Sequence, residues 1–441
     1  MKFSNVNNIT ELLKYRVPSQ SANVIKDISN QANLLEQRLY LVGGSPRDIF
    51  LAKKITDLDF AIDGDPINLA NSLPNKLHAK LIAKSQFGTI KLQLHNHTID
   101  VARTRNETYA KPGALPTVSN SSIEEDLARR DFSINSIAVS LSNPDWGNIL
   151  DPYGGRKDLD NRLIRILHPG SFNDDPTRIF RAIRYEQRLG FTIEKKTKKA
   201  LLESIEFIHS ISGERLRSEF RYIFDEPLVL DILERGRFLP ILTAIHLGFQ
   251  SFNTKEIHEA LRTMPKYYVN HFDQVHNLIY LAFLAYYLTP EESVQFIKKL
   301  SMPKSWKQIV RDTISVRSII PEITRINLKE SSLFKYLRGH CYEAILANRL
   351  LTKSECAKKR LDKFIKVLQY MKPELSGFEL QKMGVPNGPL IGQLLSEIMV
   401  QKLDGLIKSK KEEVKLIENA TNPKGLSFDI DHRSGGPESG I

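Results

Sequence analysis

Two aspartates one residue apart, Asp57 and Asp59, stand in the stretch "TDLDFAID". On a β-strand, residues i and i+2 project from the same face, so both carboxylates would point one way while Leu58 and Phe60 face a core. Two adjacent carboxylates repel each other unless cations lie between them, and hard oxygen ligands suit Mg²⁺. Asp100 ends the later stretch "HTID" and could add a third carboxylate if its strand lies alongside. Taken alone, such a pair is more often a solvated strand edge.

A glycine pair shortly before these aspartates strengthens the metal interpretation. Gly43 and Gly44 follow the apolar stretch "RLYLV" and allow the backbone to approach a ligand closely. Ser45 suits the N-cap of a helix and Pro46 suits its first position, which would point free N–H groups at a phosphate. Arg47 can add a charged contact. The alternative is a simple strand–turn–helix corner.

A third group of polar residues stands on a helix expected within "DDPTRIFRAIRYEQRLGF", framed by a proline at its start and Gly190 at its end. Its arginines recur every three or four residues and share one side: Arg178, Arg181, Arg184 and Arg188. Asp175 lies one turn before the first of them, and apolar residues lie mainly opposite. A solvated charged face is the plain alternative.

Hydrophobic patterning predicts the elements that hold these groups. Short strands are expected at "RLYLVGG", "LDFAI", "TIKLQLH" and "HTIDVAR", the last two forming a hairpin, with helices at Pro46–Ala52 and Ile67–Leu73. Strand signals fade after Asp151, and from Asp174 to about Ala420 nearly all of the chain has a helical pattern. The predicted fold class is α+β, a small mixed α/β head followed by an elongated, all-helical remainder.

Composition limits the class of protein. The 441 residues predict several domains, and the net charge of +12 favours a polyanionic partner, nucleic acid before an anionic membrane surface. A merely basic soluble protein is the alternative. Two cysteines, no signal peptide and no membrane-length apolar run predict a cytoplasmic protein without a membrane partner. His271 and His276 fit structural roles better than a metal site.

Four motifs occur in a characteristic order: "LVGGSPRD…TDLDFAID", "EEDLARRDFSINSIAV", "ILDPYGGRKDL" and "DDPTRIFRAIRYEQRLGF". Over residues 37–225 the chain thereby resembles the class II tRNA nucleotidyltransferases, or CCA-adding enzymes, and the related bacterial poly(A) polymerases. The stretch "GVPNGPLIGQLLSEIMVQKLDGLIKSKKEEV" resembles the tail of the longer bacterial members. The resemblance implies a head with a polymerase-β-like palm.

The resemblance implies roles for individual residues. Asp57 and Asp59 would bind the metal, Mg²⁺. Asp100, suggested above by its strand and not by the resemblance, is the third residue of the expected catalytic group. The expected nucleotide-binding residues are Gly43, Gly44, Ser45, Arg47, Asp48, Arg130, Asp131, Asn135, Asp175, Arg178, Arg181 and Arg184. Within this set, Asp131 would contact the sugar, and Asp175 and Arg178 would contact the base edge. Asp174 replaces the usual glutamate of that motif. Without the other motifs, "RRDF" would be a surface ion pair beside a buried Phe132.

The resemblance also implies a domain plan. It comprises an N-terminal helical extension (1–36), the catalytic head (37–150), a neck that recognises the base (151–225), an RNA-binding helical body (226–370), a tRNA-binding helical tail (371–428) and a disordered terminus (429–441). The segment 105–118 occupies the place of a flexible loop that the family uses in switching between bases, or is a plain connection. The basic stretches "TIEKKTKKALL" and "SGERLRSEFRYIF" would bind the RNA backbone.

The predicted function is template-independent addition of CCA, from CTP and ATP, to the 3′ end of tRNA, with release of pyrophosphate by a two-metal mechanism. No obligate protein partner is evident. Enzymes that add only CC or only A, and a poly(A) polymerase, share every motif quoted above. A non-catalytic RNA-binding protein is the alternative from another class, but such a protein has no physical need for a metal-binding aspartate pair.

Overall fold

The structure is a computed structural model that describes residues 2–53, 55, 58–73, 79–85, 88–94, 97–265, 267–268 and 277–421. Its contacts divide the chain into two compact units. Unit 1 contains Met1–Thr254 and Val294–Pro303, and unit 2 contains Lys255–Ser293 and Lys304–Ile441. The first boundary falls inside the helical body expected over 226–370, and the functional division into six parts stays a prediction.

A seven-stranded sheet forms the head of unit 1, with strand order β3-β4-β5-β2-β1-β8-β9. The strands are β1 (Arg38–Leu41), β2 (Leu58–Asp63), β3 (Lys80–Lys84), β4 (Thr89–Leu94), β5 (His97–Arg103), β8 (Ala138–Ser140) and β9 (Ile149–Leu150). Strands β2 and β5 are parallel, and the other neighbouring pairs are antiparallel. Asp59 on β2 is in register with Asp100 on β5, so these two carboxylates share one face of the sheet.

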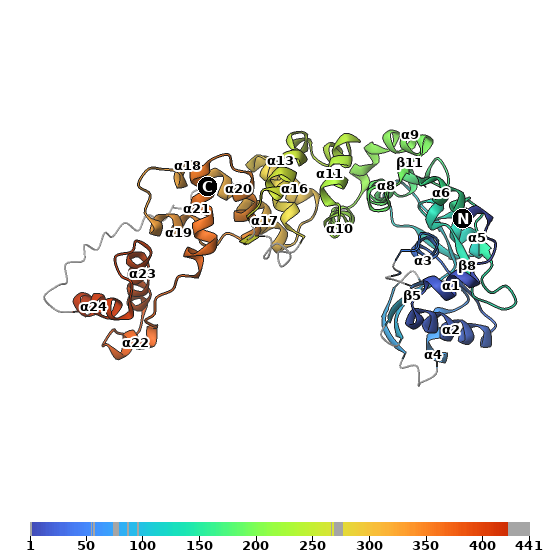
Figure 1. Ribbon diagram of the computed structural model, residues 1–441, viewed down its shortest axis with the longest axis horizontal. Helices are drawn as coiled ribbons and strands as arrows, with labels where there is room; N and C mark the ends of the chain where they lie inside the picture. Colours follow the sequence, from blue (N-terminus) through green and yellow to red (C-terminus); the bar gives the residue numbers. More distant parts are fainter. Residues whose placement is uncertain are drawn as a thin grey trace, which may run out of the picture. The chain divides into compact units, whose positions relative to one another are not determined.

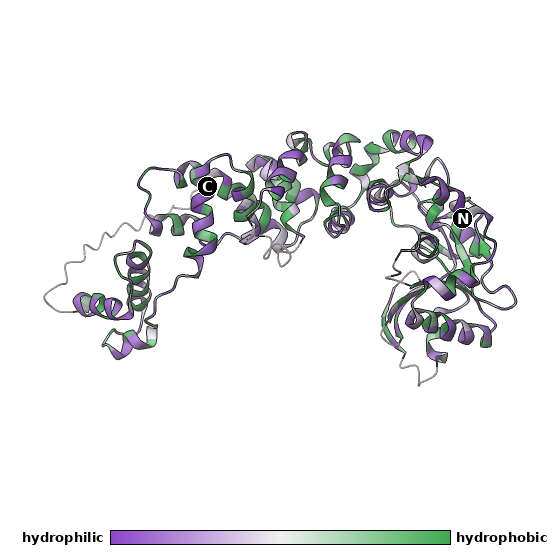
Figure 2. Ribbon diagram, in the orientation of Figure 1, coloured by the Kyte–Doolittle hydropathy of each residue, from purple (hydrophilic) through white to green (hydrophobic). Residues whose placement is uncertain are grey.

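One face of this sheet is packed into the core, and this packing fixes the register of β2. Leu58, Phe60 and Ile62 are at most 3% exposed, whereas Asp59 between them is only partly buried. A slip of one residue would bury the carboxylate and expose the apolar side chains, so the alternation holds Asp59 on the polar face. Figure 2 shows hydrophobic residues gathered along the strands of the head.

Helices cover the sheet of the head and make up most of the rest of unit 1 (Figure 1). Those of the head are η1 (Phe3–Asn5), α1 (Thr10–Arg16), α2 (Ser19–Leu34), α3 (Gly44–Phe50), α4 (Pro66–Ser72), α5 (Ile123–Ala128), η3 (Ser133–Asn135) and α6 (Gly155–Asn161). Those that follow are α7 (Ser171–Asp174), α8 (Thr177–Leu189), α9 (Lys195–Glu203), η4 (Ile205–Ser210), α10 (Gly213–Phe224), α11 (Val229–Phe238), α12 (Ile241–Ile245) and η5 (Leu247–Ser251). Two small sheets pair β6 (Arg105–Thr108) with β7 (Thr117–Asn120), and β10 (Leu163–Ile164) with β11 (Thr192–Ile193).

The remaining described elements are helical. They are α13 (Thr254–Arg262), α15 (Ile279–Tyr286), α16 (Pro290–Lys299), α17 (Lys304–Ser318), α18 (Ile320–Ile323), α19 (Glu330–Leu337), α20 (Tyr342–Leu351), α21 (Glu355–Lys366), η6 (Leu368–Tyr370), α22 (Gly377–Lys382), α23 (Pro389–Leu403) and α24 (Lys410–Thr421). The last three share a small core around Leu380, Ile398 and Ile417. Within the described ranges, no helix has both the length and the apolar character needed to cross a membrane.

The predicted fold class is confirmed, with a mixed α/β head and a mainly helical remainder. The β4–β5 hairpin and the helix ending at Gly190 are also confirmed, because β4 and β5 are antiparallel and Gly190 has a φ of 67°. The segment 105–118 is not a plain loop, since its ends form the β6–β7 hairpin. Asp57, His271, His276 and the expected tail at 429–441 lie outside the described residues.

Candidate active site

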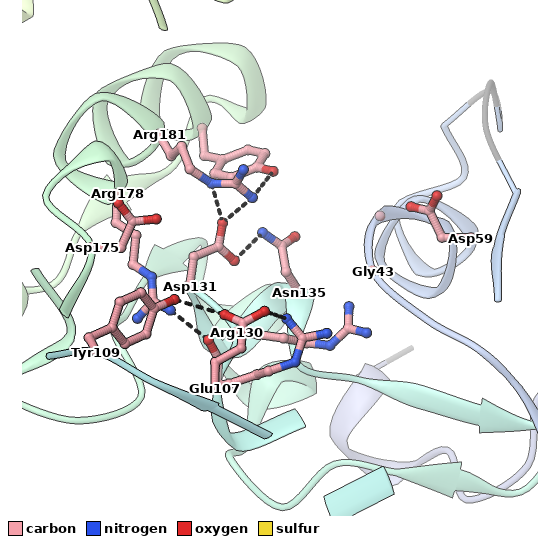
Figure 3. A pocket seen from close by; sticks show the side chains of 13 residues that line it. Gly43, Asp59, Glu107, Tyr109, Arg130, Asp131, Asn135, Asp175, Arg178 and Arg181 are labelled. Carbon is pink, nitrogen blue, oxygen red and sulfur yellow. Dashed lines mark hydrogen bonds and ion pairs between the residues drawn. The ribbon is translucent and has the colours of Figure 1, made fainter. Parts of the chain in front are cut away.

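A pocket of about 320 Å³ in unit 1 brings most of the predicted nucleotide-binding residues together. It is lined by Gly43, Gly44, Asp59, Glu107, Tyr109, Arg129, Arg130, Asp131, Asn135, Asp175, Arg178, Arg181 and Tyr185. Figure 3 shows Gly43 and Asp59 on one side of the pocket, and Asp175, Arg178 and Arg181 across from them. Its volume is in the range typical of small-molecule sites, and its lining is unusually rich in charge.

The glycine turn closes one side of this pocket. Gly43 has a φ of 72°, a conformation that L-residues with a side chain rarely adopt. A Cβ on Gly43 would lie 3.0 Å from Oδ2 of Asp59 and 3.5 Å from a guanidinium nitrogen of Arg130. Glycine is therefore required here for two independent reasons, backbone conformation and space next to the carboxylate.

Helix α3 begins two residues earlier than expected, at Gly44 instead of Pro46, which corrects the predicted role of Ser45. The helix runs over Gly44–Phe50 with Gly43 at the N-cap and no side-chain cap, because the positive φ of Gly43 turns the chain into the helix directly. Ser45 is 2% exposed and lies inside the first turn. The hydroxyl therefore does not cap the helix.

Arg47 lies under the pocket rather than in its lining. It is 4% exposed and donates to Oδ1 of Asn135 at 2.6 Å, while its other nitrogens contact the Asp48 carboxylate at 2.8–2.9 Å. Asn135 in turn donates to Oδ1 of Asp131 at 3.0 Å. Arg47 thus supports the pocket wall through Asn135, and its charge is balanced by Asp48.

Asp131 and Arg181, which both line the pocket, form an ion pair in which the aspartate is buried and the Arg181 side chain is 38% exposed. Nε of Arg181 donates to Oδ2 of Asp131 at 2.7 Å, and the Asp131 side chain is only 7% exposed. Burial opposes ionisation of this carboxyl, but the Arg181 charge and the hydrogen bond from Asn135 outweigh it and hold the pKa of Asp131 below its ordinary value. Asp131 is therefore a fixed anion and a strong hydrogen-bond acceptor.

Arg129 and Arg130 are both anchored on Asp126, which is 1% exposed. Burial opposes ionisation of Asp126, yet these two guanidinium groups hold its pKa below the ordinary value. Arg129 also donates to Glu107 at 2.8 Å, and Glu107 accepts from the Tyr109 hydroxyl at 2.8 Å. The "RRDF" motif is therefore not a surface ion pair but part of a cross-linked wall, with Phe132 fully buried behind it.

Asp175 and Arg178 are held rigidly at the start of α8. Oδ1 of Asp175 accepts from the Thr177 hydroxyl at 2.7 Å and from Arg215 of α10 at 2.7 Å. Arg178 donates to the Ser171 hydroxyl at 2.7 Å and to the Arg129 carbonyl at 2.6 Å. Both side chains line the pocket, so a base could meet one acceptor and one donor group in fixed positions.

Carboxylates on the open sheet face provide the candidate metal site. Asp59 and Asp100 are neighbours in register, and Lys91 of β4, the next strand, contacts Asp100 at 2.9 Å. Hard oxygen ligands on one face fit a divalent cation. Among the described residues no group of three or more His, Cys, Asp or Glu side chains is close enough to hold a metal. The predicted partner Asp57 is outside those residues.

Four predicted nucleotide-binding side chains lie behind or beside the lining. Ser45, Arg47 and Asp48 belong to α3 below the pocket, as described above. Arg184 faces α10 instead, where it lies 3.5 Å from Glu219 and 3.4 Å from Glu226. Four lining residues were not singled out from the sequence: Glu107, Tyr109, Arg129 and Tyr185. The strand-like alternation of "RNET" and the position of Tyr185 one turn after Arg181 were the available signals.

Two family descriptions match this chain. Residues 39–165 match the poly A polymerase head domain, and residues 190–235 match the probable RNA and SrmB-binding site of polymerase A. The A-adding tRNA nucleotidyltransferase of Geobacter sulfurreducens is 30% identical over 92% of this chain and 48% of the relative. That of Halalkalibacterium halodurans is 28% identical over 95% of this chain and 96% of the relative. This chain therefore spans about half the length of the Geobacter protein and nearly all of the second.

Solved structures agree over almost the whole chain. A CCA-adding enzyme in an apo form has a TM-score of 0.77 at 26% identity, covering 94% of this chain and 99% of that one. The Thermotoga maritima CCA-adding enzyme complexed with tRNA has a TM-score of 0.73 at 26% identity, with the same coverage. The ordered motifs, the pocket and these matches together show that the chain belongs to the family of class II tRNA nucleotidyltransferases and bacterial poly(A) polymerases.

Proposed function

We propose that this chain is a template-independent nucleotidyltransferase that extends the 3′ end of tRNA and releases pyrophosphate. One observation carries the proposal: a single pocket joins Asp59 on the polar sheet face to the buried acceptor Asp131 and the base-contacting candidate Asp175. A nucleoside triphosphate has three parts that could contact these three groups: phosphates beside a cation, a sugar and a base.

The phosphates would lie along the glycine turn, where backbone approaches closely and Arg130 supplies positive charge. The ribose would lie against Asp131, because a carboxylate held ionised by Arg181 accepts well from a sugar hydroxyl. A ribonucleotide would thereby be favoured over a deoxyribonucleotide.

The base would face Asp175 and Arg178. A carboxylate accepts a hydrogen bond from an exocyclic amine, and a guanidinium donates to a ring acceptor beside it. On their Watson–Crick edges, cytosine and adenine both present an exocyclic amine next to an unprotonated ring nitrogen, whereas the corresponding ring nitrogens of uracil and guanine carry a hydrogen and cannot accept. The two side chains would therefore select CTP and ATP without a nucleic-acid template.

Asp57 and Asp59 would hold divalent cations, and Mg²⁺ is the ion that we propose for such hard ligands. The donor set fits, since Asp59 lies on the polar face of the sheet beside Asp100. When bound, the cations would activate the attacking hydroxyl and neutralise the triphosphate.

In the reaction, the 3′-hydroxyl oxygen of the RNA forms a bond to the α-phosphorus, the bond to the β-phosphate oxygen breaks, and pyrophosphate leaves. The residues of the chain act by position and charge: Asp131 holds the sugar, Asp175 and Arg178 hold the base, and the glycine turn leaves space for the phosphates. Such positioning and fixed charge account for most of the acceleration in phosphoryl transfer.

The RNA backbone would contact exposed lysines of α9, Lys195, Lys196 and Lys199. Two of the three arginines of α10 are less available than the sequence suggests, and only Arg221 is exposed. Arg215 is bound to Asp175 and to the Gly113 carbonyl, and Arg217 donates to the Leu300 carbonyl at 3.2 Å. We therefore expect α9 to contribute more than α10 to RNA affinity.

Full CCA addition is the programme that we propose first. Addition of A alone is the second candidate, favoured by the names of the relatives from Geobacter sulfurreducens and Halalkalibacterium halodurans. An extension assay with tRNA transcripts ending before CCA, after C and after CC separates the two. Each transcript is supplied with CTP, ATP, both or neither, in the presence of Mg²⁺.

Stepwise completion to CCA would support the full enzyme, and growth only from the CC end with ATP would support A addition. A stop after CC would identify a CC-adding enzyme, and a long A tail a poly(A) polymerase. Failure of every transcript to grow would overturn transfer and favour an RNA-binding protein.

A further inference from the structure

Residues 2–17 form an N-terminal strap that packs on α3 and α6 of the head (Figure 1). The backbone N–H groups of Phe3 and Ser4 donate to the Asp160 carboxylate at 2.8 and 3.0 Å. The N–H of Ile9 donates to the Gly147 carbonyl at 2.9 Å, and the Ile9 side chain is fully buried. The strap is therefore attached to the head at both of its ends and along its length.

The last residue of α1, Arg16, is bound to the C-terminal turn of α3. One of its terminal nitrogens donates to the Ile49 carbonyl at 2.9 Å and to the Phe50 carbonyl at 2.6 Å. The last carbonyls of a helix lack intrahelical donors, and a cation there also interacts favourably with the helix dipole. At the other end of the strap, the Phe3 ring lies 5.5 Å from the Phe50 ring, between centroids.

Helix α3 needs such support because it is short. It has seven residues and no side-chain N-cap, and an isolated helix of that length is not stable in water. Ala52, just after it, has a φ of 52°, an unfavourable conformation for alanine. Contacts with the rest of the head, including those from the strap, must therefore hold α3 in place.

The position of α3 is transmitted to the pocket through Arg47 and the glycine turn. Arg47 donates to Asn135 at 2.6 Å, and Asn135 donates to Asp131 at 3.0 Å. Gly43 and Gly44, at the start of the same helix, line the pocket directly. A shift of α3 along its axis would therefore move both the sugar-contacting carboxylate and the phosphate-facing backbone.

We infer that the N-terminal strap sets the geometry of the nucleotide site, with Arg16 as a positioning residue that acts through α3. The inference rests on the proposed function of the pocket in nucleotide binding. It predicts that loss of the Arg16 contact weakens nucleotide binding while leaving RNA binding intact, because the exposed lysines proposed for RNA contact lie on α9.

The test compares the full-length chain with Arg16→Met and with a control on the same helix, Tyr15→Ala. Tyr15 is 83% exposed, so its truncation changes α1 without touching α3. Binding of labelled ATP with Mg²⁺ is measured by equilibrium dialysis without tRNA, so no transfer can occur. For Arg16→Met we expect the Kd for ATP to rise about 3- to 30-fold, because hydrogen bonds from a charged group are worth about 10- to 150-fold and only part of that reaches the pocket through α3.

Two further measurements separate positioning from general damage to the fold. Arg16→Lys keeps the charge and a donor, so it should restore part of the affinity, whereas a site that only needs apolar packing would prefer methionine. Affinity for labelled tRNA, measured by filter binding, should be unchanged in all three variants. If Arg16→Met does not fold, Phe3→Leu tests the second contact to α3 in the same assay.

The outcomes distinguish this inference from the proposed function. Failure of the unmodified protein to bind ATP would overturn nucleotide binding at the pocket. If the unmodified protein binds ATP and Arg16→Met binds it equally well, the strap has no positioning role. An equal loss of ATP and tRNA affinity in Arg16→Met would mean a general structural defect and would also overturn the inference.

Discussion

Aspartates at the two ends of the pocket are in opposite electrostatic environments. At the sheet end, Asp59 is only partly buried, and its register neighbour Asp100 has a side chain that is 38% exposed. At the other end of the pocket, next to α8 and here called the neck end, Asp131 is 7% exposed and forms an ion pair with Arg181. Asp126 behind it is 1% exposed and forms ion pairs with two arginines. The same residue type is thus partly exposed at one end, where Asp100 pairs with a half-exposed lysine, and buried in ion pairs with arginines at the other.

This difference indicates a division of work. A carboxylate that is near water can exchange its partners and accept a metal ion, whereas a buried carboxylate that loses its arginine is left as an uncompensated charge. The sheet end suits cations that arrive with the substrate, and the neck end suits fixed recognition of a sugar and a base. Variants at the two ends should therefore fail in different ways.

The largest effect is expected from Asp59→Asn, which removes the charge of a proposed metal ligand and hardly changes the size of the side chain. A bound metal ion supplies several kcal/mol of transition-state stabilisation, and each loss of about 1.36 kcal/mol slows the reaction tenfold. The rate of transfer should therefore fall by at least about a thousandfold. Single-turnover transfer to a tRNA transcript measures it, with tRNA affinity as the control that should not change. Substantial transfer by this variant would show that Asp59 is not a metal ligand.

At the neck end, Arg181→Met should destabilise unit 1, because it leaves the Asp131 carboxylate buried without its cation. Breaking a fully buried pair in this way costs about 3–5 kcal/mol, but the Arg181 side chain is 38% exposed, so we expect a loss of about 1–3 kcal/mol, which urea unfolding of the variant would measure. The double variant Arg181→Met/Asp131→Asn removes both charges and should recover much of the stability but little of the nucleotide affinity. Equal stability of the single and double variants would argue against a buried ion pair.

Gly43→Ala tests the contact between the two ends. The φ of 72° costs alanine about 1–2 kcal/mol, and the new Cβ would lie 3.0 Å from Asp59 Oδ2. Gly190→Ala is the matched control, since its φ is 67° and a Cβ there would meet nothing within 4 Å. Both variants should lose similar stability in urea unfolding, and only Gly43→Ala should also lose transfer activity. An equal loss of activity in both would mean that the space beside Asp59 does not matter.

The smallest effect on transfer activity is expected from Glu219 on α10, whose side chain is 8% exposed and 3.5 Å from Arg184. Burial raises the pKa of Glu219 from 4.5 to about 7, against the opposing charge of Arg184. Between these values the folded state binds more protons than the unfolded state, so this group's contribution to stability is present below about pH 4.5 and lost as the pH rises to about 7.

Glu219→Gln should therefore remove part of the fall in stability between pH 5 and pH 8. At about 1.4 kcal/mol per pKa unit, the difference between the variant and the unmodified protein should change by about 2 kcal/mol over this range. Urea unfolding at the two pH values measures it. A constant difference would mean that Glu219 titrates in its ordinary range.

Local pattern predicted much of the site. The order of the motifs, the alternation around Asp59 and the helix after Asp175 each depend on residues close in sequence, and all of these elements form as expected. The partners of the charged residues were not predictable in the same way. Arg181 meets Asp131 and Arg215 meets Asp175 across 50 and 40 residues, and several arginines on one helix gave no means of choosing between them.

The predicted roles of Ser45 and Arg184 were wrong, and the Arg16 contact was not predicted, for physical reasons. Ser45 has the side chain of an N-cap, but the positive φ of Gly43 starts α3 one residue before it. Arg184 shares a side of α8 with Arg181 in a helical projection, yet α10 packs there and offers Glu219 and Glu226. The Arg16 contact joins residues 33 apart and involves backbone carbonyls, which carry no signature in the sequence.

The most direct test of the divided pocket is the choice of nucleotide by the unmodified protein and by Asp175→Ala. Each of the four α-labelled nucleoside triphosphates is offered with Mg²⁺ and a tRNA transcript, and label incorporated into RNA is measured. We expect the unmodified protein to incorporate label from CTP and ATP. Asp175→Ala should still incorporate label, but with less selectivity among the four nucleotides. Incorporation from none of the four by the unmodified protein, or unchanged selectivity in Asp175→Ala, would contradict the proposed division of the pocket.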